Sequence, residues 1–208
     1  MVEKFLNDDN ILNIYMHGSK VYKTNTTLSD YDYILIVNKP LKELNFSYEN
    51  EDFVVFTKQE WEEMALDNNC DFLECIFLEN NFKLKETFVP EYTLDFNKIR
   101  SNFSKKASNS FVKCKKKLEV EKDFNPYVAK KSLFHSLRLL QFGIQILKYG
   151  KIINYSCCNN LFTEIMDEKS NDWKVFKEKY QKIYNKYKSE FRAFDNYYHI
   201  QKTFEEAR

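Results

Sequence analysis

The stretch that decides the fold is residues 30–37, DYDYILIV, which is followed by Asn38-Lys39-Pro40. Its β-branched and aromatic residues, closed by a turn, predict a β-strand. Residues i and i+2 of a strand share a face, so Asp30 and Asp32 are expected to project together. The alternating residues would pack on the opposite face: Tyr31, Tyr33, Leu35 and Val37.

The carboxylates of Asp30 and Asp32 suit a divalent cation. At ~3.3 Å of rise per residue their Cα atoms would lie ~7 Å apart, within reach of one metal ion. Carboxylates on one face repel each other unless a cation neutralises them, and Mg²⁺ prefers such oxygen ligands. The alternative is a polar strand entrance with solvated carboxylates, because a lone Asp-x-Asp is common.

Two neighbouring stretches would supply further parts of a site. Residues 11–16, ILNIYM, predict a strand that leads to Gly18-Ser19. This small pair would let a triphosphate approach backbone amides and a hydroxyl, although an ordinary strand-to-helix turn is the alternative. Asp52 opens another predicted strand, residues 51–56, and would bring a third carboxylate to the first two. The alternative for Asp52 is a surface cap.

Short helices are expected around these strands. Residues 2–9 predict a first helix. Thr57, with Glu60 three residues later, forms a capping-box pattern that opens a helix to about residue 68. Residues 71–78, DFLECIFL, are apolar and are interpreted as a helix.

Helical patterns dominate from about residue 95. Residues 97–122 predict a basic helix, and residues 127–149 predict a long helix that stops at Gly150. A last helix carries a stripe at three- and four-residue steps, which we expect to be core rather than a base-stacking surface. The stripe consists of Trp173, Phe176, Tyr180, Ile183, Tyr187 and Phe191.

The predicted fold class is α+β: a small N-terminal mixed-sheet lobe over residues 1–95, then an all-helical C-terminal lobe over residues 96–208. The chain has 208 residues and is 43% hydrophobic, which excludes long disorder. Lys+Arg total 32 against 31 Asp+Glu, so any attraction for nucleic acid must be local.

Several simple patterns are missing from the sequence. No apolar run approaches the ~18 residues of a membrane span, and the N-terminus lacks a signal-peptide pattern. We therefore expect a cytoplasmic protein with no membrane partner. The five cysteines show no C-x-x-C spacing and are expected to be reduced thiols. The Lys-rich, Gly-poor composition lacks P-loop and Rossmann fingerprints and is typical of an AT-rich genome, such as that of a virus or phage.

Residues 98–117 concentrate eight basic side chains and contain no acid. Such a helix could bind the phosphate backbone of RNA or DNA, form a plain solvated face, or contact a protein partner. The basic residues are Lys98, Arg100, Lys105, Lys106, Lys113, Lys115, Lys116 and Lys117. The last six of these are the candidate nucleic-acid contacts.

His135 and Arg138 form a polar stripe on an otherwise apolar predicted helix. They are i and i+3, with Lys131 one turn earlier. Arg138 is one of four arginines against 28 lysines, and a guanidinium binds phosphates and carboxylates in a bidentate way that lysine cannot. The two residues could contact a triphosphate or Glu74; a surface stripe or an interlobe salt bridge is the alternative.

Taken together, Gly18-Ser19 and, eleven residues after the serine, Asp30-Tyr31-Asp32 resemble the nucleotidyltransferase superfamily typified by DNA polymerase β. The stretch is most similar to its uncharacterised bacterial and viral branch. Residues 52–57, 72–77 and 131–140 are similar to further segments of that branch. The chain departs from the pattern at Lys23, where the branch usually has glycine; Lys23 could contact a phosphate or alter the path of the loop.

The resemblance implies a mechanism and a set of ligands. Asp30, Asp32 and Asp52 would bind two Mg²⁺ (or Mn²⁺) ions, while Gly18 and Ser19 would hold the triphosphate of an NTP such as ATP. Lys23, His135 and Arg138 are further candidate nucleotide contacts. The leading prediction is transfer of an NMP to the 3′ end of an RNA such as tRNA, which the basic helix favours. The alternatives are transfer to a protein or small-molecule hydroxyl, and a catalytically silent nucleotide or RNA binder.

Overall fold

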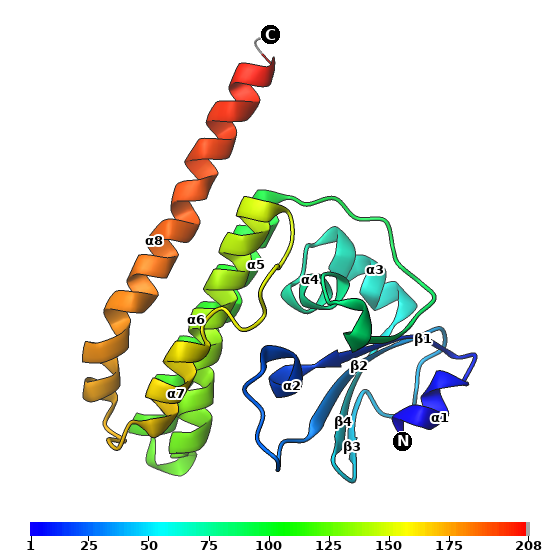
Figure 1. Cartoon of the computed structure of the whole chain (residues 1–208), viewed down its shortest axis with the longest axis horizontal. Helices are drawn as coiled ribbons and strands as arrows, with labels where there is room; N and C mark the ends of the chain where they lie inside the picture. Colours follow the sequence, from blue (N-terminus) through cyan, green and yellow to red (C-terminus); the bar gives the residue numbers. More distant parts are fainter. Residues whose placement is uncertain (207–208) are drawn as a thin grey trace. The chain divides into compact units, whose positions relative to one another are not determined.

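The computed structural model describes residues 1–206, with side chains described up to residue 194. The chain has the expected α+β fold and divides into two compact units, Met1–Leu94 and Asp95–Arg208. The first unit contains a sheet and short helices. In the described part of the second unit, all regular elements are helices and none is a strand (Figure 1). Within the described residues, no helix is both long and apolar enough to cross a membrane.

The first unit is built on a five-stranded mixed sheet with the strand order β3-β4-β2-β1-β5. Strands β2 and β4 pair in parallel, and the other neighbours are antiparallel. The strands are β1 (Ile11–His17), β2 (Tyr31–Val37), β3 (Asn45–Tyr48), β4 (Glu51–Thr57) and β5 (Lys83–Glu86). The expected strand at residues 30–37 is thus the centre of the sheet.

Four α-helices accompany the sheet: α1 (Val2–Leu6), α2 (Gly18–Tyr22), α3 (Lys58–Leu66) and α4 (Cys70–Ile76). The predicted capping box at the start of α3 is confirmed, because Thr57 Oγ1 accepts from the Glu60 amide while the Glu60 carboxylate accepts from the Thr57 amide. Residues 71–78 are confirmed as mainly helical.

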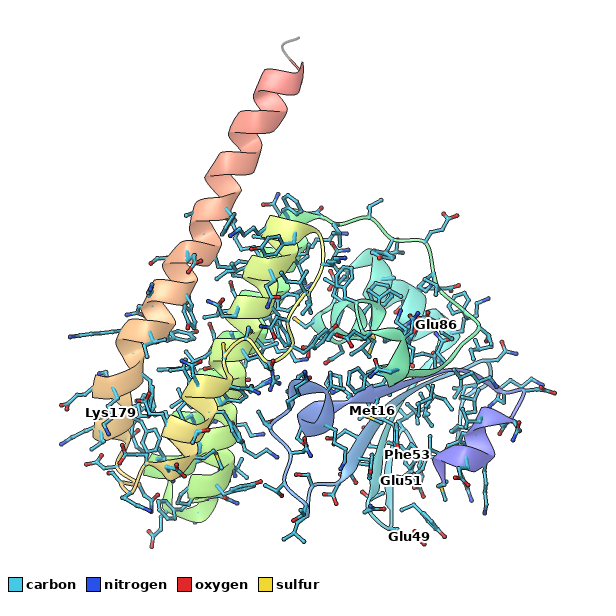
Figure 2. The ribbon with its side chains drawn as sticks, in the orientation of Figure 1. Met16, Glu49, Glu51, Phe53, Glu86 and Lys179 are labelled. Atoms are coloured by element: carbon cyan, nitrogen blue, oxygen red, sulfur yellow. The ribbon has the colours of Figure 1, made fainter. Side chains whose placement is uncertain are left out.

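The two faces of the sheet have different covers. On one face Tyr33, Leu35 and Val37 form a cluster with Phe53 and Met16, as the alternation predicted, and Phe5 of α1 packs on Phe53 (Figure 2). On the other face Tyr15 stacks on Trp61 of α3, and Trp61 contacts Phe72 of α4. Each face therefore has its own apolar cover. Asp32 alternates with Tyr33 along β2, so its side chain lies on the face covered by α3 and α4.

The second unit comprises α5 (Phe96–Glu119), α6 (Pro126–Tyr149), α7 (Asn159–Asp167) and α8 (Trp173–Glu206). The start and stop of α6 follow the sequence signals, since Asn125 caps its first turn and Gly150 ends it at φ +71°. Helices α6 and α8 meet closely at Gly143, where an added Cβ would lie 2.4 Å from Cζ of Phe191.

Some elements differ from the sequence predictions. Strands β3 and β5 and helix α7 were not predicted. The two strands are only four residues long, whereas the sequence of α7 does have helical spacing, with the buried Leu161 and Ile165 four residues apart. On α8 the buried stripe includes Tyr184, whereas Ile183 and Tyr187 are only half-buried. The stripe is therefore rotated relative to the prediction, but its role in the core is confirmed by the burial of Phe176 and Tyr180.

Candidate functional site

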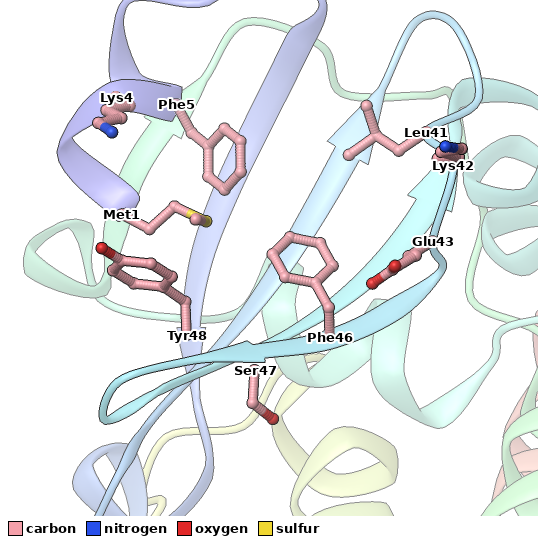
Figure 3. A pocket seen from close by; sticks show the side chains of 9 residues that line it. All are labelled: Met1, Lys4, Phe5, Leu41, Lys42, Glu43, Phe46, Ser47 and Tyr48. Carbon is pink, nitrogen blue, oxygen red and sulfur yellow. The ribbon is translucent and has the colours of Figure 1, made fainter.

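The sheet register aligns four polar residues in one row. Asp32 on β2 lies opposite His17 on β1 and opposite Asp52 on β4, and Asp52 lies opposite Ser47 on β3. Directly paired residues point to the same face, and neighbouring strands are ~4.8 Å apart. Figure 3 shows Ser47 pointing away from the apolar groove formed by Phe5 and Phe46, so the row lies on the opposite face from that groove.

Asp30 lies just before this row. It is exposed, and it precedes the first residue of β2 by one position. The next residue, Tyr31, is paired with Glu51, which places Asp30 at the entrance of the parallel β2–β4 pair. The structure therefore brings Asp32 and Asp52 together on adjacent strands and leaves Asp30 at the edge of the row.

Gly18 makes the closest approach to Asp32. Its φ is +72°, and a Cβ built on it would lie 1.8 Å from Oδ2 of Asp32 and 2.6 Å from Cγ. A side chain at this position is therefore excluded twice, by backbone conformation and by the space that the carboxylate occupies. The glycine of the Gly18-Ser19 pair holds the chain against the aspartate.

Ser19 and Lys23 lie on the short helix that follows. The Ser19 carbonyl accepts from the Thr24 amide at 2.9 Å, and Lys23 ends α2 in the left-handed conformation at φ +58°. A glycine is favoured at such a helix end. Lys23 thus puts a side chain where the backbone conformation favours glycine.

A second cluster, absent from the sequence prediction, surrounds the end of β1. His17, Asp71 and Glu74 each offer a ligand atom, and these atoms all lie within 4.8 Å of one another. Among the described His, Cys, Asp and Glu side chains, these three are the group whose ligand atoms lie close enough together to hold a metal ion. The nitrogen and oxygen donors also suit a hydrogen-bonded network without a metal.

The hydrogen bonds of this cluster indicate which of its atoms carry protons. The Tyr22 hydroxyl donates to Glu74 Oε2 at 2.7 Å and lies 2.9 Å from His17 Nε2. A phenol has a single proton, so Nε2 of His17 donates to the Tyr22 oxygen. Glu74 is 1% exposed, and His17 Nε2 lies 3.5 Å from its carboxylate, which provides a partner for the buried charge.

A local signal for this cluster existed in the sequence. Asp71 and Glu74 are i and i+3, which places them side by side once residues 70–76 are helical. His17 joins them only through the packing of α4 near β1, and sequence spacing does not encode that contact.

His135 and Arg138 lie on α6 in the second unit. Arg138 is 5% exposed, so the surface-stripe alternative is wrong for this residue. Its Nη2 lies 2.7 Å from Nδ1 of His135, and its guanidinium is near the rings of Phe134 and Phe142. Because a guanidinium only donates, Nδ1 of His135 accepts and the imidazole is neutral with its proton on Nε2.

The basic segment is helical, as predicted, and forms most of α5. Lys105, Lys113 and Lys116 are exposed on it. Lys115 pairs with Glu119 at 3.6 Å, and Lys117 pairs with Asp123 at 3.2 Å. Glu119 and Asp123, which follow the segment, therefore neutralise part of its positive charge.

Comparison with solved structures gives a likeness at the level of the fold. The chain is similar to the spectinomycin adenyltransferase AAD(9) from Enterococcus faecialis, whose structure was solved with ATP and spectinomycin. The two chains are 14% identical, the match covers 92% of this chain and 96% of that chain, and the TM-score is 0.48. No family model and no curated protein matches the chain. A likeness at this level carries no argument about activity.

Proposed function

We propose that this protein is a metal-dependent nucleotidyltransferase of the DNA polymerase β-like superfamily, which transfers an NMP from an NTP to an acceptor hydroxyl. One observation carries the proposal: Asp32 and Asp52 are paired on adjacent parallel strands, with the backbone of Gly18 held against the Asp32 carboxylate. This arrangement unites the Gly-Ser turn, the Asp-x-Asp strand and the third acid, which are separate in sequence.

The three acids offer the donor type that a hard divalent cation prefers, although their ligand atoms do not all lie within 4.8 Å of one another as those of His17, Asp71 and Glu74 do. Asp32 and Asp52 are carboxylates on the same face of neighbouring strands, and Asp30 adds a third acid at the entrance of the pair. Oxygen-only donors of this kind suit Mg²⁺ or Mn²⁺. These three residues would hold the metal, which when bound would neutralise phosphate charge and lower the pKa of an acceptor hydroxyl.

The chain's own residues would position the substrate. Gly18 has no side chain, so its main chain lies directly against the Asp32 carboxylate. The Ser19 hydroxyl and the Lys23 ammonium would supply donors to the triphosphate. Catalysis of this kind depends mainly on positioning and electrostatics, because the acceptor oxygen displaces pyrophosphate in a single in-line step. Nucleotide contacts by His135 and Arg138 remain a prediction, tested by the effect of Arg138→Lys on the KM for NTP.

The proposed acceptor is the 3′ end of an RNA. Exposed lysines at positions 105, 113 and 116 on α5 support this choice, because they can neutralise backbone phosphates. The ion pairs of Lys115 and Lys117 favour a second candidate, a small-molecule or protein hydroxyl, because they reduce the charge available to a polyanion.

The experiment follows label from each α-labelled NTP into RNA and into protein, with Mg²⁺ or Mn²⁺. Asp32→Asn and Asp52→Asn remove one charge each without changing side-chain size, and both should abolish transfer. Glu62→Gln is the matched control, because Glu62 is an exposed acid of the same unit outside the site. Retained transfer in Asp32→Asn and Asp52→Asn, or equal loss in Glu62→Gln, would contradict the proposal.

A lysine variant then separates the acceptors. Changing Lys105, Lys113 and Lys116 together to Gln should weaken RNA labelling and reduce its dependence on salt. If labelling of a small molecule or a protein persists unchanged in this variant, the second candidate acceptor replaces RNA.

A further inference from the structure

Two adjacent cysteines of the helical unit lie in an unusual environment that the proposed transfer reaction does not use. Sγ of Cys157 and Sγ of Cys158 are 3.8 Å apart, and neither cysteine forms a disulfide in the structure. Cys157 is partly exposed, whereas Cys158 is buried. Cys157 is therefore accessible to small solutes, whereas Cys158 is shielded from solvent.

The backbone that carries the pair is firmly held. The buried side chain of Gln145 accepts from the amides of Ile153 and Asn154 at 3.0 and 2.8 Å and donates to the Asn154 carbonyl at 3.1 Å. Immediately afterwards, the Cys158 carbonyl accepts from Leu161 at the start of α7. The two thiols thus lie between a loop held by Gln145 and the start of α7.

Electrostatics make the two thiols unequal. Hydrogen bonding with Cys158 and the positive charge of Arg138 lower the pKa of the Cys157 thiol, against the opposing effect of burial. The same hydrogen bond and burial raise the pKa of Cys158. Burial raises the pKa of Cys114, on α5, to about 12, so that thiol remains protonated. Cys157 is the thiol best suited to form a nucleophilic thiolate.

We propose that Cys157 and Cys158 form a peroxide-sensitive dithiol, in which Cys157 reacts first and Cys158 closes a reversible disulfide. The Cys157 thiolate attacks one oxygen of hydrogen peroxide, the O–O bond breaks, and the departing hydroxide takes up a proton to become water. Cys158 then attacks the sulfenic sulfur as a thiolate and forms the S–S bond, and its proton leaves with the sulfenic hydroxyl as a second water. The two sulfurs lose two electrons in total, and the peroxide gains them.

The neighbouring positions of the two residues explain why the bond would be reversible. Consecutive Cα atoms are about 3.8 Å apart across a trans peptide, whereas unstrained disulfides join Cα atoms about 4.4–6.8 Å apart. A disulfide here would be strained, and strained disulfides are readily reduced by other thiols. The site is therefore suited to transient oxidation rather than to permanent cross-linking.

The test uses the full reduced chain with hydrogen peroxide and no nucleotide, so that its result is independent of the proposed transfer reaction. We expect each chain to lose two titratable thiols. The peptide that contains both cysteines should become lighter by the mass of two hydrogens, and dithiothreitol should restore its original mass. In Cys158→Ser, Cys157 should stop at a sulfenic acid that dimedone traps. Cys157→Ser should leave the peptide unoxidised, and the control Cys114→Ser should behave as the natural chain.

A rate measurement keeps the proposal testable if a variant misfolds. In the natural chain, iodoacetamide should label Cys157 at least about tenfold faster than Cys114, because the thiolate is the reactive form. Equal rates at the two cysteines, oxidation that spares the 157–158 peptide, or a disulfide formed only between chains would overturn the proposal.

Discussion

The contact between Gly18 and the Asp32 carboxylate gives the most demanding prediction, Gly18→Ala. The change adds one methyl group at φ +72°, where an L-residue costs about 1–2 kcal/mol more than glycine. The methyl carbon would also lie 1.8 Å from Oδ2 and 2.9 Å from Cβ of Asp32. Either the strand or the carboxylate must move, and such overpacking typically adds about 1–3 kcal/mol.

Gly150→Ala is the matched control for this substitution. Gly150 has φ +71°, and nothing lies within 4 Å of an added Cβ. Its alanine variant should therefore show the backbone cost alone. Urea unfolding followed by the fluorescence of Trp61 for the first unit and Trp173 for the second, in single-tryptophan backgrounds, measures each loss in the unit concerned. We expect Gly18→Ala to lose at least about 1 kcal/mol more than Gly150→Ala.

A double substitution identifies Asp32 as the source of the difference. In an Asp32→Ala background the two shortest contacts disappear, so the cost of Gly18→Ala should fall toward that of Gly150→Ala. Transfer activity should fall roughly a hundredfold in Gly18→Ala, because displacement of a positioned group by about 1 Å has that effect. Equal stability losses at the two glycines, or an unchanged cost in the Asp32→Ala background, would refute the reasoning.

The remaining predictions concern stability. Lys23→Gly should be more stable than Lys23→Ala by about 1 kcal/mol in urea unfolding, because both remove the side chain and only glycine relieves the φ of +58°; equal stabilities would argue against strain there. Thr57→Ala should lose about 1 kcal/mol, since it removes the capping box of α3, and an unchanged unfolding midpoint would contradict this. Gly143→Ala should lose about 1–3 kcal/mol in thermal unfolding through its clash with Phe191, a loss that Phe191→Leu should reduce. Burial raises the pKa of Tyr33 to about 12, so the unfolded chain loses that proton first and stability should fall as pH rises from about 10 to about 12. Tyr33→Phe should make this decline shallower in urea unfolding, and an identical slope would show that Tyr33 does not contribute.

Local signals predicted much of the secondary structure, because each one satisfies backbone groups or apolar faces within a few residues. Thr57 with Glu60 marked the start of α3, and Gly150 marked the end of α6. The β3 strand carried no such signal, since Asn45–Tyr48 is a short edge strand with little apolar alternation. Its pairing depends on β4, which comes later in the chain.

The candidate site was predictable only in part. The alternation at Asp30 and Asp32 indicated a shared face, and the small residue at Gly18 indicated a close approach. The sequence did not indicate that Lys23 takes a left-handed conformation, because lysine disfavours it, nor that His17 meets Asp71 and Glu74. Those features depend on where α2 and α4 pack.

The sequence by itself determined which residues could share a strand face or a helix face, because side-chain direction follows the local period of the backbone. It thereby predicted His135 and Arg138 as neighbours on one helix, and it predicted Asp30 and Asp32 on one strand face, although β2 begins only at Tyr31. Only the tertiary structure decided that Asp52 lies beside Asp32, that Gly18 closes on its carboxylate, and that Arg138 is buried. Strand register and burial arise from contacts between distant segments, and a shift of one residue would have turned Asp52 to the other face.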